Sequence, residues 1–285
     1  TDTSNGYANN NGETQRFKKN GIYLIEAITN NGILDYNLTK YCIIPRNGMK
    51  INFNTHFCRG EYPLPQGINV VADNVILDCN GALIKGQDDP YGVTLNEIDE
   101  AAVKNCNIEG YRTGILLFEA DKNDIINNFI NQSSFEVVPY EGILLLGSHY
   151  NFLAENSATE GFMGFKLIQS TENLWKNNKA TKFSSGFYIY SESNNNTFEN
   201  NEVYDHSDSG FLVSSSDFNV IRNNEVHDDL FMSGDGIHLL SGSYGNKIVN
   251  NTFTKMGHGI YLRNTLYNNI NNNNITNNDY GIYTH

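Results

Sequence analysis

A short element of a glycine, an apolar residue, any residue and a second apolar residue recurs nine times along the chain. Its glycines are Gly92, Gly114, Gly142, Gly164, Gly186, Gly210, Gly236, Gly259 and Gly281. Two further patterns repeat between them: asparagine, any residue, apolar, as at Asn173, and a pair of asparagines with the same continuation, as at Asn200. Each repeat of about 22 residues therefore predicts three short strands.

Three strands in so short a repeat leave no room for a helix, so each repeat should form one coil of a solenoid. Equivalent residues of neighbouring coils would then stack at about 4.8 Å. In the glycine element, the second and fourth residues should point inward and the third outward, because side chains alternate along a strand. The asparagines fit tight corners, where they tolerate left-handed backbone, and a stacked row of them could bond one coil to the next.

The sequence thus predicts an all-β fold, a right-handed parallel β-helix of about nine coils with an N-terminal cap. We expect residues 67–285 to form the β-helix and residues 1–66 to form a tail and the cap that protects the end of the solenoid from edge pairing. The chain starts at Thr1 without an apolar leader, as expected of a mature chain from which a leader has been removed.

Charge and hydropathy exclude two classes of partner. The 285 residues carry a formal net charge of −13, which argues against nucleic acid and anionic membrane surfaces. No run of eighteen apolar residues is present, so membrane insertion is not expected.

Four cysteines permit two disulfides or none. Cys42 and Cys58 lie in the predicted cap, whereas Cys79 and Cys106 occupy equivalent places in adjacent coils. Stacked cysteines usually serve as small buried apolar residues, and we favour that interpretation. A disulfide at either pair is the alternative.

The repeats and the stretch from Gly67 to Ile84 resemble the right-handed parallel β-helix repeat proteins. The resemblance is to the NosD-like group in particular and, more widely, to the carbohydrate-binding and sugar-hydrolase β-helix class. It covers about residues 66–285 and implies a secreted protein, extracellular or at the cell surface, that often acts on polysaccharide. It specifies architecture better than activity, because one fold supports many functions.

The outward positions of the glycine element are unusually apolar and aromatic for a solvent-facing strand. The third position and the position two residues later include Leu144, Leu146, Ile168, Tyr188, Tyr190, Leu212 and Tyr261. One interpretation is a sugar-binding trough in which the tyrosines stack on substrate and Glu141 and Leu212 add contacts. The other is a surface covered by the N-terminal segment or by another subunit.

Two coils are longer than the basic repeat, with extra residues at 131–141 and 227–235. Both insertions precede a glycine element, so they would form walls at the two ends of a groove. Neutral surface loops are the alternative.

The residues just before each glycine form the sharpest polar cluster, because Ser209 (with Asp208 before it), Asp235 and His258 fall on consecutive coils. A carboxylate beside an imidazole orients it as an acid–base pair requires, and two carboxylates one coil apart suit glycoside hydrolysis. Ser-Gly-Asp235-Gly-Ile-His and Gly-His258-Gly resemble motifs of polygalacturonases, which are also β-helices. The chain departs from that family at Gly236, where the family has a second aspartate, and it lacks the Arg-Ile-Lys motif.

A second catalytic interpretation uses Lys166, Tyr188, His238, Tyr261 and Arg263. Polysaccharide lyases and uronate epimerases on β-helices need a base and a cation that neutralises the uronate. Lysine, histidine and tyrosine could act as the base, and arginine as the cation.

Metal binding is less specific in this sequence. Asp228, Asp229 and Asp235 could hold Ca²⁺, but their spacing matches no known loop. His238 and His258 with Asp235 could form a transition-metal site. NosD-like proteins are linked with copper-site maturation, but the chain has no histidine cluster and no Cys-x-x-Cys. We therefore assign no metal ligands, and Ca²⁺ remains an open alternative.

The leading hypothesis is an exported protein that binds a polysaccharide and cleaves or modifies it on the face of the glycine elements, as a lyase, epimerase or hydrolase. The alternative is a non-catalytic structural, adhesin or spike module whose apolar face forms an oligomer.

Overall fold

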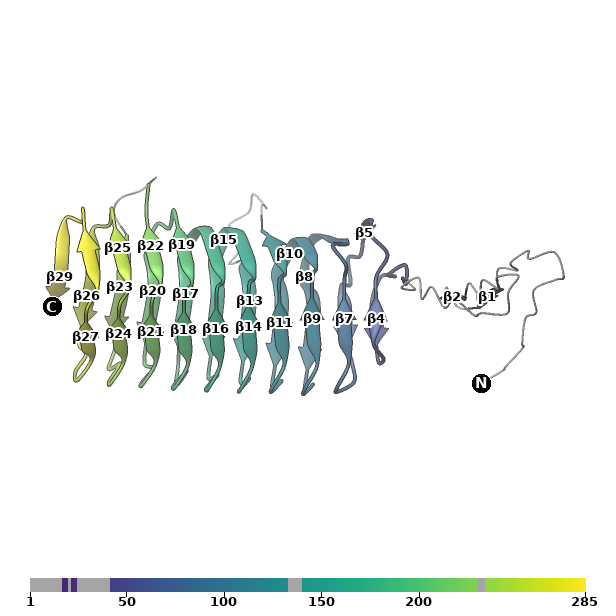
Figure 1. Ribbon diagram of the computed structural model, residues 1–285, viewed down its shortest axis with the longest axis horizontal. Helices are drawn as coiled ribbons and strands as arrows, with labels where there is room; N and C mark the ends of the chain where they lie inside the picture. The colour runs from purple at the N-terminus through teal and green to yellow at the C-terminus, as the bar shows by residue number, and fades with distance from the viewer. Residues whose placement is uncertain (1–16, 20–21, 25–41, 133–139, 230–233) are drawn as a thin grey trace, which may run out of the picture.

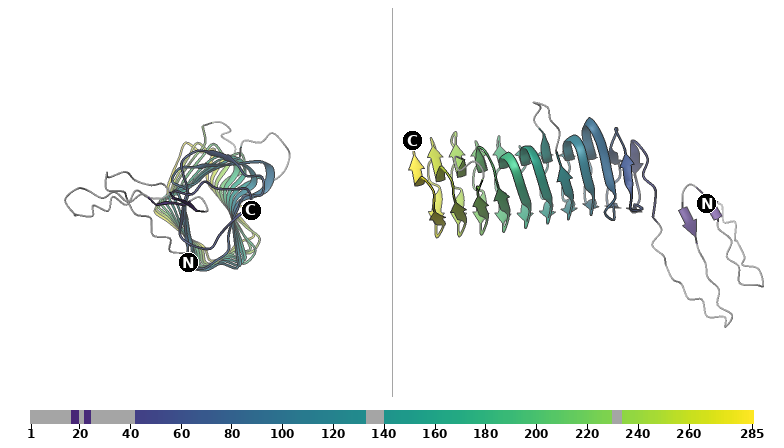
Figure 2. Two further views of the ribbon diagram at one scale, coloured as in Figure 1. Left: turned by 90° about the vertical axis from the view of Figure 1, so that its right-hand side faces the viewer. Right: turned by 90° about the horizontal axis from the view of Figure 1, so that it is seen from above.

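The computed structural model describes residues 17–19, 22–24, 42–132, 140–229 and 234–285. Within these residues the chain forms β-strands and no helix, and the strands from β3 onward stack as successive coils along one axis (Figure 1). Seen down that axis, the coils superimpose on a common outline (Figure 2). The predicted all-β parallel β-helix is confirmed. One sheet contains ten strands, so the solenoid has about ten coils, one more than predicted.

Each complete coil has three faces, which we number in chain order. The first face is the ten-stranded sheet of β4 (Thr55–His56), β7 (Ile76–Asp78), β9 (Ala102–Lys104), β11 (Asp124–Ile126), β14 (Phe152–Ala154), β16 (Leu174–Lys176), β18 (Thr197–Glu199), β21 (Val220–Arg222), β24 (Lys247–Val249) and β27 (Asn269–Asn271).

The second face contains β5 (Glu61–Pro63), β12 (Phe129–Asn131), β19 (Glu202–Tyr204), β22 (Glu225–His227), β25 (Thr252–Thr254) and β28 (Asn274–Thr276). The third face, which carries the glycine elements, contains β3 (Met49–Ile51), β6 (Ile68–Val70), β13 (Glu141–Leu146), β20 (Ser209–Ser214), β23 (Asp235–Leu240), β26 (His258–Arg263) and β29 (Tyr280–Thr284).

Four longer strands run from the second face onto the third: β8 (Leu83–Asn96), β10 (Asn107–Phe118), β15 (Ser157–Ile168) and β17 (Lys179–Tyr190). The remaining two, β1 (Phe17–Lys19) and β2 (Ile22–Leu24), pair with each other in antiparallel fashion.

The regular solenoid starts before Gly67. Strands β3, β4 and β5 already pair in parallel with β6, β7 and β8 of the next coil. The predicted tail and cap comprise residues 1–66, of which 1–16, 20–21 and 25–41 lie outside the described residues, so the cap stays a prediction.

The core follows the alternation within the glycine elements. Ile143 and Leu145 are fully buried, as are their counterparts on the following coils up to Ile237 and Leu239. The rings of Phe165, Phe187 and Phe211 stack along the axis with centroids 4.8 and 4.7 Å apart. The predicted inward positions are therefore confirmed.

Two ladders of asparagines run along the solenoid, all of them buried except the partly buried last members Asn268 and Asn273. One contains Asn123, Asn151, Asn173, Asn196, Asn219, Asn246 and Asn268, and the other contains Asn128, Asn156, Asn178, Asn201, Asn224, Asn251 and Asn273. In both, the backbone N–H of each asparagine donates to the side-chain oxygen of the next, over 2.8–3.1 Å. The ladders satisfy polar groups at corners from which water is excluded.

The paired asparagines divide two tasks between them. In Asn200-Asn201, the first residue adopts a left-handed backbone with φ of 54° and remains exposed, while the second is buried in the ladder. Asn223-Asn224 repeats this arrangement. Asparagine suits both places, because it tolerates the left-handed region and its amide both donates and accepts.

The stacked glycines permit close approach of neighbouring coils. A Cβ added at Gly210 would lie 2.3 Å from a methyl group of Val226 and 2.7 Å from the carbonyl oxygen of Gly236. Any side chain at this position would therefore separate the coils.

The structure contains both disulfides, Cys42–Cys58 and Cys79–Cys106. The interpretation of the cysteines as free apolar residues was wrong. Stacking on adjacent coils brings the Cα atoms of Cys79 and Cys106 to 4.7 Å, which is within bonding range.

Replacing Asn196 by alanine should strongly destabilise the fold. It removes the acceptor for the Asn173 N–H and the donor to the Ser170 carbonyl, and leaves both groups buried. We expect a loss of about 3–5 kcal/mol in the free energy of unfolding, measured by urea denaturation. The control is Asn195→Gly, an exposed left-handed position, which should change it by less than about 0.5 kcal/mol. Equal effects of the two substitutions would contradict the role of the ladder.

Replacing Cys79 and Cys106 together by alanine should lower the free energy of unfolding by about 3–4 kcal/mol, because the bond closes a loop between residues 27 positions apart. Thermal unfolding with and without a reductant measures the effect. Titration of the denatured wild type with a thiol reagent should detect no free thiol, and four free thiols would contradict both bonds.

Candidate functional site

Two histidines of the third face contact the carboxylate of Asp235. Asp235 begins β23, His238 lies on the same strand, and His258 begins β26 in register with Asp235. The Nδ1 atom of His258 lies 2.7 Å from Oδ1 of Asp235, and the Nδ1 atom of His238 lies 3.3 Å from Oδ2. Asp235 is only 8% exposed, so both its oxygens are committed to the imidazoles. The predicted pairing of Asp235 and His258 is thus realised in the geometry.

Tyrosine rings surround the two imidazoles. The ring of Tyr261 stacks on His238 with centroids 4.4 Å apart and lies 5.2 Å from the ring of His258. Tyr280 and Tyr283 lie 5.1 and 5.0 Å from His258. Sequence reasoning did not select these last two as site residues, although both belong to the last glycine repeat and continue the columns of His258 and Tyr261.

Burial sets the protonation of this cluster. Burial lowers the pKa of His238, and the charges of Arg263 and His258 lower it further against the opposing effect of Asp208. Burial raises the pKa of Asp235, and the contact with His258 partly offsets the rise. His238 is therefore held as a neutral imidazole at pH 7. Its Nε2 atom is buried and has no hydrogen-bond partner among the described residues.

Asp208 and Arg263 lie at the edges of the cluster. Asp208 is exposed and accepts a hydrogen bond from the Ser185 hydroxyl over 3.2 Å. Ser209, not Asp208, is the residue in register with Asp235. Arg263 is exposed near the C-terminal end of β26, two positions beyond Tyr261.

Lys166 and Glu141 are separate from this cluster. They form an ion pair of 2.8 Å, and Thr113 donates a second hydrogen bond to Glu141 over 3.0 Å. Glu141 is 8% exposed. Because each of these charges is occupied by the other, Lys166 as a base and Glu141 as a sugar contact receive no support from the geometry.

Tyr188 and Tyr190 lie together on β17, two coils from Asp235 and His238 and three coils from His258 along the third face. Their rings stack with centroids 5.3 Å apart, and Tyr190 is 40% exposed. Leu212 is in register between Tyr188 and His238. This arrangement provides an aromatic surface beside the histidines, as a sugar subsite requires.

The two predicted walls cannot be described. Residues 133–139 of the first inserted segment and 230–233 of the second lie outside the described residues.

A groove of about 580 Å³ lies elsewhere, at the corner between the first and second faces. His56, Asp78 and Asn105 are among its lining residues, and none was predicted as a site residue. The signal was present in Asp78-Cys79-Asn80 and Asn105-Cys106-Asn107, where polar residues flank both stacked cysteines.

The stacked coils, the three parallel faces and the asparagine ladders define a parallel β-helix protein. The family model described as periplasmic copper-binding protein (NosD) matches residues 74–256, and the chain belongs to this family. No curated protein matches the chain.

Solved structures of similar fold include three sugar-related proteins. The periplasmic alginate epimerase AlgG has a TM-score of 0.55 and 14% identity, over 81% of this chain and 70% of that protein. A mutant tailspike protein of E. coli bacteriophage HK620, in complex with a pentasaccharide, has a TM-score of 0.59 and 13% identity, over 82% of this chain and 48% of that protein. The catalytic domain of a GH87 α-1,3-glucanase in complex with nigerose has a TM-score of 0.54 and 16% identity, over 83% of this chain and 61% of that domain.

At these identities the similarity shows the fold alone, and the chain spans about half the length of the tailspike protein.

The family description raises the question of copper. Copper is bound by thiolate, thioether or imidazole groups, and all four cysteines form disulfides, so they offer no thiolate. No group of three or more His, Cys, Asp or Glu among the described residues could hold a metal ion. The residues that the structure describes therefore do not fit a copper site. Two of the three aspartates considered for Ca²⁺ are also engaged, Asp229 by His227 and Lys255, and Asp235 by the histidines.

Replacing Arg263 by glutamine should raise the pKa of His238 toward its usual value of about 6.5, because a neighbouring positive charge is removed. An NMR pH titration of the His238 ring, assigned with a His238→Gln variant, measures the change. In the wild type, the contribution of His238 to stability should be present above pH 6.5 and lost as the pH falls, because the unfolded chain binds the proton more tightly. The control Arg222→Gln, at a charge paired with Glu199 on the first face, should leave the titration unchanged. A His238 pKa above 6.5 in the wild type would contradict the assignment.

Proposed function

We propose that the protein binds a polysaccharide along its third face and modifies it by proton transfer at a uronate residue. The observation that carries the proposal is the carboxylate of Asp235, held between two imidazoles at 2.7 and 3.3 Å. A carboxylate that accepts a hydrogen bond from Nδ1 orients the ring and leaves Nε2 as a base. The sugar-related neighbours support the substrate class.

In this proposal His258 is the base, because its side chain is 25% exposed whereas the Nε2 atom of His238 is buried. The Nε2 atom of His258 removes the proton from carbon 5 of a uronate. Arg263 neutralises the substrate carboxylate, into which the electron pair is delocalised. His238 and Asp235 position His258 and Tyr261.

Two outcomes then share this first step. In β-elimination, the electron pair forms the C4–C5 double bond, the C4–O bond breaks, and the Tyr261 hydroxyl donates its proton to the departing oxygen. In epimerisation, the electron pair returns from the substrate carboxylate to carbon 5, which takes the proton of the Tyr261 hydroxyl on its opposite side. Tyr188 and Tyr190 provide the stacking surface for neighbouring sugar residues.

Hydrolysis by two carboxylates is less well supported. It requires one carboxyl group to act as an acid and the other as a base or nucleophile. Both oxygens of Asp235 already accept hydrogen bonds or ion-pair contacts, and Asp208 is not in register with it.

The proposal includes export to an extracytoplasmic compartment. Two disulfides form and persist in an oxidising environment. The family description and that of the alginate epimerase are both periplasmic, which agrees with this location. No helix among the described residues is long and apolar enough to cross a bilayer.

A non-catalytic module that associates with another protein chain is the second candidate. The outward side chains of Leu116, Phe118, Leu144, Leu146 and Ile168 are half-buried and adjoin across three coils of the third face. Such a continuous apolar strip is typical of a surface that contacts another molecule.

A panel of neutral and uronate polysaccharides, assayed with and without Ca²⁺, tests the function. We expect either absorbance at 232 nm from an unsaturated product or a change of C5 configuration detected by NMR. His258→Ala should reduce turnover by a factor of about 10²–10⁴ with little change in melting temperature. The matched control His227→Ala, at a histidine paired with Asp229 on the second face, should retain activity.

New reducing ends without absorbance at 232 nm would instead indicate hydrolysis through Asp208 and Asp235. Full activity in His258→Ala would exclude His258 as the base. The absence of every signal across the panel would favour the association module, for which sedimentation should detect a defined oligomer.

A further inference from the structure

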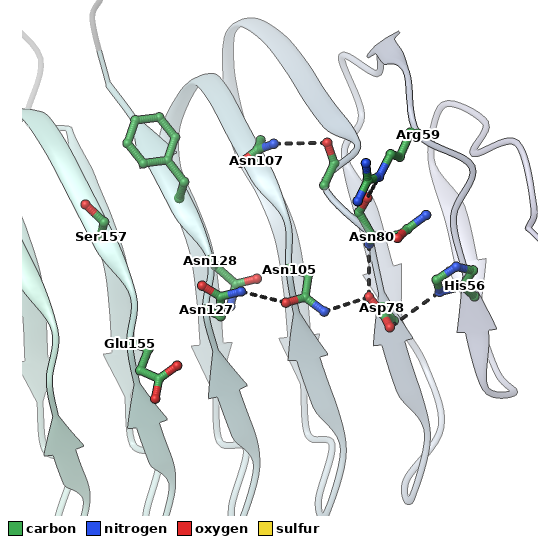
Figure 3. Close-up of a pocket in the computed structure, with 12 residues that line it drawn as sticks. His56, Arg59, Asp78, Asn80, Asn105, Asn107, Asn127, Asn128, Glu155 and Ser157 are labelled. Carbon is green, nitrogen blue, oxygen red and sulfur yellow. Dashed lines mark hydrogen bonds and ion pairs between the residues drawn. The ribbon is translucent and has the colours of Figure 1, made fainter.

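The groove at the corner between the first and second faces has an ordered polar wall (Figure 3). Asn127 donates from Nδ2 to Oδ1 of Asn105 over 2.7 Å, and Asn105 donates from Nδ2 to Oδ1 of Asp78 over 2.9 Å. Each side chain comes from a successive coil, so the row runs along the solenoid axis. The second N–H of each amide and the Oδ1 atom of Asn127 remain available to a ligand.

Asp78 is held rigidly at the end of this row. The backbone N–H of Asn80 donates to it over 2.9 Å, and His56 lies 3.4 Å from its other oxygen. Burial alone would raise the pKa of Asp78, but the hydrogen bonds from Asn105 and Asn80 and the charges of His56 and Lys104 together hold it below its usual value. The group is therefore a carboxylate at neutral pH and accepts hydrogen bonds from a ligand.

An exposed aromatic ring lies on the adjoining face. Phe129 is 43% exposed, between Asn107 and Ser157 on the neighbouring coils. Asn107 donates from Nδ2 to the Gly81 carbonyl over 3.0 Å, which fixes its amide and leaves Oδ1 as an acceptor. An apolar ring bordered by fixed amides matches a pyranose, which has an apolar C–H face and hydroxyl groups at its rim that both donate and accept.

We propose that this groove is a second, non-catalytic binding site for a short neutral stretch of polysaccharide. Its charges favour a neutral ligand over a polyanion, because Arg59 and Lys104 are offset by Asp78 and Glu155. Its volume of about 580 Å³ lies within the usual range for small-ligand sites.

The groove is independent of the histidine cluster. On the first face, the groove extends from β4 to β14. Strands β16, β18 and β21 follow before β24, which lies in the coil of His258. The near end of the groove therefore lies three coils, about 14 Å, from Asp235 along the axis and four coils, about 19 Å, from His258, on a different face. The groove would hold a polymer chain without contributing to the reaction.

Isothermal titration of the full chain with neutral hexasaccharides, namely cellohexaose, maltohexaose, xylohexaose and chitohexaose, and with hexagalacturonate tests this proposal. The His258→Ala variant serves as the background, so that no ligand is consumed. We expect at least one neutral hexasaccharide to bind. Phe129→Ala and Asn127→Asp should each weaken it about tenfold, as expected from the loss of one stacking contact or one hydrogen-bond donor.

The matched control is Phe162→Ala, which removes a phenyl ring of similar exposure, 46%, outside the groove, and should bind like the background protein. Asn127→Asp keeps a residue that tolerates the left-handed backbone, with φ of 53°, so a folded variant is available. The proposal is overturned if no neutral hexasaccharide binds, if all variants bind equally, or if hexagalacturonate binds more tightly than every neutral ligand.

These outcomes are separable from those of the proposed function. Turnover by the wild type without binding that depends on Phe129 would contradict the groove and leave the reaction intact. Binding that depends on Phe129, without turnover of any polymer, would do the reverse.

Discussion

From Asn123 and Asn128 to Asn246 and Asn251, each coil turns two of its corners by burying an asparagine, and the amide of that asparagine must find partners where water cannot reach. The side-chain oxygen of that asparagine accepts hydrogen bonds from the backbone N–H and from Nδ2 of the equivalent asparagine on the preceding coil, at 2.8–3.2 Å. Because no single coil can satisfy its own corners, coils are stable only as a stack. The in-register columns on the third face follow from this requirement, including the column that places Asp235 beside His258.

Periodicity was sufficient to predict the fold. The glycine elements and the paired asparagines specify the coil length, the inward residues and the corners. Each of these positions recurs on so many coils that the pattern does not arise by chance. The ends of the solenoid were less predictable. Strands β3, β4 and β5 pair with the next coil although their residues lack the glycine element, because backbone pairing does not require the motif.

The sequence predicted contacts between residues at equivalent positions of adjacent coils. It did not predict contacts between residues at different positions of adjacent coils. Asp235 and His258 follow from register, whereas the ion pair between Lys166 and Glu141 joins neighbouring columns on adjacent coils. The groove at the first corner was not predicted, because its shape depends on how exposed asparagine side chains orient, which residue type alone does not specify. The sequence did not decide whether Cys79 forms a disulfide, because stacked cysteines also occur unbonded.

The two ladders keep a constant separation within every coil. Asn123 and Asn128, Asn196 and Asn201, and Asn246 and Asn251 are all five positions apart. All variation in coil length, from 22 to 28 residues, therefore lies between the second ladder and the next member of the first. Evolution can lengthen, shorten or exchange these outer segments without disturbing the first face. The hydrogen bonds of the two ladders fix the width of the first face. The second and third faces can change in length and sequence, and with them the ligands that the surface binds.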